Sequence, residues 1–170
     1  MTSSLVLTGG YHSLEAVSRY TEAGFEASLP SLITGRFWHG CGGFISEAGG
    51  GQVLLVTGGV RDDLTYLAST EVMTSSLWRE VGQLPVASMM SGLSLDNEIL
   101  MFGEFIAIVI GHLISNRSTG GYDGHQHYSH ILRFDKKTVS WRAVGNMSEA
   151  RAQHAVSSVP YNMIRHYCEN

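Results

Sequence analysis

Short apolar runs that end in glycine recur along this chain and set its hydrophobic pattern. Each run is rich in leucine, isoleucine and valine, and residues of this kind between turn-forming positions are typical of β-strands. Successive runs lie roughly 40 to 50 residues apart, within the range of known repeat architectures. The pattern therefore predicts an all-β repeat protein. The runs are 5–8 before Gly9-Gly10, 54–57 before Gly58-Gly59, and 99–102 before Gly103.

Further landmarks accompany each run in the same order. A second strand follows the glycines, then a strand with one large aromatic residue, and then a strand that carries arginine and histidine. The glycines suit a turn with positive φ, and the aromatic residue can fill the space between two twisted sheets. A β-sandwich also has short strands, but it does not explain this recurrence. The predicted members are strands 35–44, 89–95 and 151–159, strands 16–20, 69–73 and 130–134, and the aromatic residues Phe25, Trp78 and Trp141.

Composition narrows the class of protein further. The chain has 170 residues, enough for one domain, with 44% hydrophobic residues, 20 glycines and only 15% charged residues. A net charge of −4 gives no broad basic surface, so we expect no nucleic-acid partner. No secretory leader is visible, and the longest apolar run, 105–114, is about half the length that a bilayer span requires. We therefore expect no membrane span, and the compartment stays open between secreted and cytoplasmic.

These landmarks resemble the kelch repeat over nearly the whole chain. The closest matches to the family's phrase are 53–59 with 69–72, and 120–124 with 131–135 and 138–141. The resemblance implies a kelch-type β-propeller, similar to the central domain of galactose oxidase. In this chain the resemblance implies about three four-stranded blades over 1–159. They cover approximately 1–34, 35–86 and 87–147, and a closing strand follows over 148–159. Phe25 in place of tryptophan, and a strand near Met89 without Arg and His, predict looser packing in those blades.

Segment 104–120 interrupts the third repeat. Its removal would join Gly103 to Gly121 and restore both a glycine pair and the spacing of the tryptophans; Gly120-Gly121 is the alternative pair within the uninterrupted sequence. We interpret the segment as a retained intron, with a genuine long loop as the alternative. Because closed propellers have 4–8 blades, the repeats also predict an incomplete propeller whose open blade edges can self-associate. Residues 160–170 form a tail without a repeat role.

One histidine cluster is a weak candidate for metal binding. His125, His127 and His130 lie near Asp123, and histidines can hold zinc or copper. Their spacing matches no strong metal motif, so no metal and no cofactor is predicted. The enzymatic alternative, a galactose-oxidase-like copper enzyme, needs a copper site of tyrosine and histidine ligands with a tyrosine–cysteine cross-link, and no motif places these residues here. The sequence therefore predicts no catalytic residues.

The repeat residues favour a scaffold over an enzyme. We expect four residues of the repeated sequence pattern to hydrogen-bond within their strands and hold blades together. They are Arg36, His39, Arg151 and His154. The resemblance implies a protein-binding propeller whose partner contacts the rim loops, with a carbohydrate-binding propeller as a further alternative. Loops are where a rigid frame usually carries binding residues. The candidate contact loops are 11–15, 61–67 and 122–128.

Two cysteines leave the redox compartment open. Cys41 lies in a predicted strand, where we expect a small buried side chain, and Cys168 lies in the tail. A disulfide between them would tether the tail and indicate a secreted protein. Two ordinary thiols agree equally well with the sequence, because the two positions could lie a blade or more apart.

Overall fold

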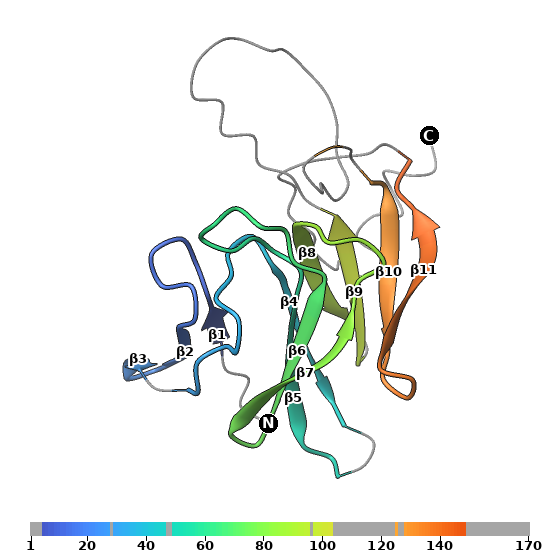
Figure 1. Cartoon of the computed structure of the whole chain (residues 1–170). Helices are drawn as coiled ribbons and strands as arrows, with labels where there is room; N and C mark the ends of the chain where they lie inside the picture. The colour runs from blue at the N-terminus through green and yellow to red at the C-terminus, as the bar shows by residue number, and fades with distance from the viewer. Residues whose placement is uncertain are drawn as a thin grey trace, which may run out of the picture.

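The computed structural model describes residues 5–27, 29–46, 49–95, 97–103, 125 and 128–148. These residues form three antiparallel sheets, and none of the described residues is helical. Within this part of the chain no helix is long and apolar enough to cross a membrane. The prediction of an all-β protein is therefore confirmed. The three sheets stand side by side in chain order, and none is closed on itself (Figure 1).

Each sheet is a meander in which neighbours in sequence are neighbours in space. The first sheet has three strands, and the second and third sheets have four strands each. The first sheet contains β1 (Leu5–Thr8), β2 (Val17–Thr21) and β3 (Gly24–Ala27). The second contains β4 (Gly40–Ile45), β5 (Gln52–Thr57), β6 (Ser69–Thr74) and β7 (Leu77–Gln83). The third contains β8 (Met90–Leu95), β9 (Glu98–Gly103), β10 (His130–Asp135) and β11 (Ser140–Asn146).

The three sheets repeat one another position by position. Tyr20 pairs with Phe25 in the first sheet, as Met73 pairs with Trp78 in the second and Phe134 with Trp141 in the third. The second and third sheets also share an irregularity. The register shifts after Thr70 in β6 and after Ile131 in β10, which are equivalent positions counted back from the aromatic pair. This correspondence allows residues of one sheet to be compared directly with residues of the next.

The core of the described residues contains two apolar layers, one at each junction between sheets, and a smaller buried cluster of Phe37, Val60 and Met89 in the connecting segments. We call the layer between the first and second sheets the first junction, and the layer between the second and third sheets the second junction. Trp78 lies in the first junction and donates its indole N–H to the carbonyl oxygen of Pro30 (2.7 Å). Trp141 lies in the second and donates to the Thr70 hydroxyl (2.8 Å). Both tryptophans therefore fill the space between sheets, as predicted.

Both glycine pairs adopt the predicted backbone conformation. Gly9 and Gly10 have φ of 59° and 126°, and Gly58 and Gly59 have φ of 65° and 91°. A Cβ atom on Gly9 would collide with the carbonyl oxygen of Arg36, and one on Gly58 would collide with that of Ser88. Glycine is thus required both by the turn and by the close approach of the next segment of backbone.

Three expectations differ from the structure. The strand predicted over 35–44 begins only at Gly40, because the Arg36 amide bonds back to Leu14 of the preceding repeat while its side chain bonds forward to Gly58 of the second sheet, which holds 36–39 as a loop. Phe25 is 62% exposed rather than packed between sheets, because no described residues cover its side of the first sheet. Cys41 is exposed rather than buried, because its position in β4 alternates with those that face the third sheet.

Candidate functional site

The connecting loops gather at one end of the sheets, which we call the loop end. It comprises segments 9–16, 29–39, 58–68 and 84–89, which join β1 to β2, β3 to β4, β5 to β6, and β7 to β8. Backbone hydrogen bonds link these segments, since Gly10 N donates to Arg36 O (3.2 Å) and Gly59 N donates to Ser88 O (2.9 Å). The loops from β3 to β4 and from β7 to β8 are therefore each fixed to the glycine turn of the repeat before them.

A buried ion pair lies at the loop end of the first junction. Arg36 and Glu71 are both completely buried, and one guanidinium nitrogen of Arg36 lies 2.5 Å from Oε1 of Glu71. Arg36 also donates to the carbonyl oxygens of Thr34 (3.2 Å), Gly58 (2.9 Å) and Ser69 (3.1 Å) and to the Ser69 hydroxyl (3.0 Å). The pair therefore ties the loop between β3 and β4 to β6 of the following sheet.

The carboxylate of Glu71 is also hydrogen-bonded through both of its oxygen atoms. Oε2 of Glu71 accepts the Ile33 amide (2.8 Å), and Oε1 also accepts the Thr34 amide (3.0 Å). Burial lowers the pKa of Arg36, and the charge and hydrogen bond of Glu71 oppose that shift. A buried ion pair is tolerated only when such additional hydrogen bonds satisfy both partners. This saturation leaves Arg36 no capacity for a ligand, so its role is to join the sheets.

His39 lies between the two glycine turns. Its Nε2 lies 2.7 Å from the Thr8 hydroxyl, and its side chain occupies the space that a Cβ on Gly9 or Gly59 would need. Nδ1 is buried and has no hydrogen-bond partner among the described residues. Burial, together with the charge of Arg36, lowers the pKa of His39 to about 4. The ring is therefore neutral at physiological pH and acts as a packing element of the first junction.

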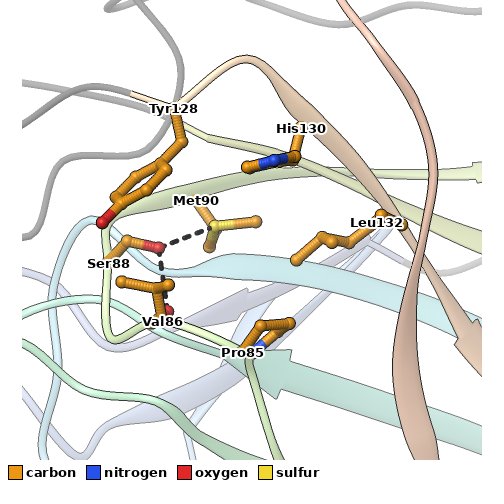
Figure 2. A pocket seen from close by; sticks show the side chains of 8 residues that line it. Pro85, Val86, Ser88, Met90, Tyr128, His130 and Leu132 are labelled. Atoms are coloured by element: carbon orange, nitrogen blue, oxygen red, sulfur yellow. Dashed lines mark hydrogen bonds between the residues drawn. The ribbon is translucent and has the colours of Figure 1, made fainter.

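The second junction has a cavity at its loop end, where the first junction has the ion pair. Its volume is about 130 Å³, and in Figure 2 Tyr128 and His130 lie on one side of it, with Pro85 and Val86 on the other. The Ser88 hydroxyl donates to the carbonyl oxygen of Val86 (3.3 Å). The rings of Tyr128 and His130 are stacked, with centroids 5.8 Å apart. The other lining residues are Met90, Leu132 and Ala143.

This cavity lies at the position that the ion pair fills in the first junction. Arg36 N donates to Leu14 O as Ser88 N donates to Leu67 O, so Ser88 is the equivalent of Arg36. Glu71 and Leu132 each lie two residues before the residue that pairs with the tryptophan, so Leu132 is the equivalent of Glu71. In the second junction the small Ser88 stands where the first has Arg36, and the apolar Leu132 stands where the first has Glu71. No ion pair fills the space between them, so it stays open. The looser packing predicted near Met89 agrees with this.

Two loops of the loop end present exposed apolar side chains. Tyr11 is 65% exposed, and its ring makes an edge contact with Phe37 (centroids 5.3 Å apart). Leu64 is 68% exposed at the tip of a tight turn with φ of 64°. Asp63 stabilises this turn by accepting the Thr65 amide (3.0 Å), and the hydroxyl and amide of Thr65 lower the pKa of Asp63. These side chains are thus held out on ordered loops.

Several predicted site residues lie outside the described residues. This applies to Gly120, Gly121, His127, Arg151, His154 and Cys168, to the insert 104–120, to residues 149–159 of the predicted closing strand 148–159 and to the tail. The disulfide of Cys41 with Cys168 therefore stays a prediction. His130 lines the cavity, and His125 is exposed. The described residues contain no group of three potential metal ligands, and His127 is not among them.

Sequence reasoning did not identify Glu71, Ser88 or the cavity. A signal for Glu71 was present, because a lone acidic residue stands in the otherwise uncharged strand 69–74. Its alternation with Met73 puts it on the buried face. No comparable signal marks Ser88, since only the packing of two sheets reveals that it faces Leu132.

Comparison with known proteins adds no family. No protein-family model matches the chain, and no curated protein matches it significantly.

Proposed function

We propose that the chain is part of a kelch-type β-propeller that binds a protein partner at its loop end. Three equivalent antiparallel meanders, stacked through buried aromatic residues, support the blade interpretation, as do the matching glycine turns within the first two of them. The observation that carries the binding proposal is the exposure of Tyr11 and Leu64 on loops that hydrogen bonds hold in place. A rigid frame with exposed loop residues is the usual arrangement of a binding surface.

The cavity beside Ser88 supports the same surface. Tyr128 belongs to the third candidate contact loop, 122–128, and lines the cavity. A volume of about 130 Å³ accommodates one apolar side chain of a partner. A side chain anchored in a desolvated pocket is typical of the residues that dominate binding energy. We therefore include the cavity in the proposed surface.

Affinity capture with matched variants tests this proposal. The baits are the wild-type chain, a Tyr11→Ser/Leu64→Ser variant of the loop end, and Leu77→Ser as a control. Leu77 is 73% exposed and is the first residue of β7, next to the turn that follows β6, at the opposite end of the sheets. We expect partners that the wild type and the control retain and the loop variant loses. Equal capture by all three baits would contradict the proposal.

A further inference from the structure

The outward face of the first sheet is apolar and exposed. Leu5, Tyr20 and Phe25 are aligned across the three strands and share one face with Leu7. They are 59%, 46%, 62% and 48% exposed, respectively. Tyr20 and Phe25 make an edge contact with ring centroids 5.1 Å apart. Four large apolar side chains on one small sheet form a continuous patch rather than scattered surface residues.

The equivalent face is covered in both other sheets. In the second sheet it carries Leu54, Val56, Met73 and Trp78, which pack against the first sheet. In the third sheet it carries Ile99, Met101, Phe134 and Trp141, which pack against the second. The aromatic residues, Trp78 and Trp141, are each only 8% exposed. The first sheet thus presents a face that, in the other repeats, belongs to a sheet-on-sheet interface.

The third sheet presents the complementary face. The first sheet covers its neighbour with Val17 and Leu32, and with Val6 beside them. Hydrogen bonding identifies Met147 as the equivalent of Leu32, because Leu32 N donates to Glu15 O and Met147 N donates to Ser129 O. Counting from the aromatic pairs makes Ile131 the equivalent of Val17 and Leu100 that of Val6. All three equivalents are apolar and partly exposed.

We propose that two copies of this chain associate head to tail, each placing its third sheet on the outward face of the partner's first sheet. The contact would continue the junctions already present within one chain. A head-to-tail contact either closes into a ring or grows into an open series. The described residues of two copies supply six sheets, within the 4–8 that closed propellers contain, so we infer a closed dimer. This inference rests on the blade interpretation within the proposed function, and not on the protein partner proposed above.

The mass of the purified chain in solution tests this directly. Sedimentation equilibrium should give twice the chain mass of 18.5 kDa, and Phe25→Glu should give a monomer that keeps the wild-type circular dichroism spectrum. Tyr20→Glu provides a second variant of the same face, and Leu77→Glu, outside both faces, should stay dimeric. A wild-type monomer at every soluble concentration would overturn the proposal, as would a series of higher oligomers or a dimer that Phe25→Glu leaves intact.

Mixing two variants distinguishes head-to-tail contact from contact between two first sheets. A Leu100→Glu variant has an altered third sheet and an intact first sheet, whereas Phe25→Glu has the reverse. Each should be monomeric alone, and an equimolar mixture should form dimers through the one pair of unaltered faces. Absence of dimer in the mixture, while both variants keep the wild-type spectrum, would contradict the head-to-tail arrangement.

Discussion

The two junctions of this molecule share one backbone arrangement but differ in the side chains at their loop end. At the loop end of the first junction, Arg36 and Glu71 form a buried ion pair. At the equivalent place in the second junction, Ser88 and Leu132 line a cavity of about 130 Å³. The backbone hydrogen bonds around both sites are the same. The comparison teaches that the repeated backbone defines the junction, whereas individual side chains decide whether the space between sheets is filled or left open.

Removal of Arg36 should have the largest effect on stability. In Arg36→Met the carboxylate of Glu71 stays buried without its counter-ion, and we expect the free energy of unfolding to fall by about 3 to 5 kcal/mol. Denaturant titration measures this change. Arg61→Met is the control, because Arg61 is about half exposed and its change should stay within about 0.5 kcal/mol. Equal effects of the two substitutions would mean that the buried pair does not hold the first junction together.

His39 should make the first junction sensitive to acid. Its pKa is about 4 in the folded chain and 6.5 in the unfolded chain, so between these values only the unfolded state binds the proton. Stability should therefore fall as the pH is lowered from 6.5 to 4, by on the order of 2 to 3 kcal/mol in total. His39→Gln should reduce this loss, whereas replacement of the exposed His12 by Gln should not. Denaturant midpoints measured across this pH range provide the check; identical profiles for all three proteins would contradict the assignment.

Filling the cavity should have the smallest effect, with the opposite sign. Ser88→Leu places an apolar side chain in the open space of the second junction, and we expect the free energy of unfolding to rise by about 1 kcal/mol. Ser88→Ala removes the hydroxyl without filling the space and should give no such gain. A thermal melt of both variants distinguishes these results. A loss of stability in Ser88→Leu alone would show that the space beside Ser88 cannot accept a larger side chain.

The sequence predicted the repeated elements better than their mutual packing. The strands before Gly9 and Gly58, and the burial of Trp78 and Trp141, follow from local pattern, because alternation and turn chemistry act within a few residues. The start of β4 could not be predicted in this way, since Arg36 is held in a loop by bonds to Glu71, which is distant in sequence. The exposure of Phe25 likewise depends on distant parts of the molecule and not on the local sequence. Its sequence context matches that of Trp78, and only the covering sheet differs.

The most direct test of the central comparison is a pair of double-mutant cycles, one at each junction. The first combines Arg36→Met with Glu71→Leu, and the second combines Ser88→Ala with Leu132→Ala, with the free energy of unfolding measured for every variant. We predict a coupling energy above about 2 kcal/mol at the first junction, because each single substitution strands a buried charge. At the second we predict a coupling within about 0.5 kcal/mol of zero, since no charge is lost there. Equal coupling energies at the two junctions would contradict the account.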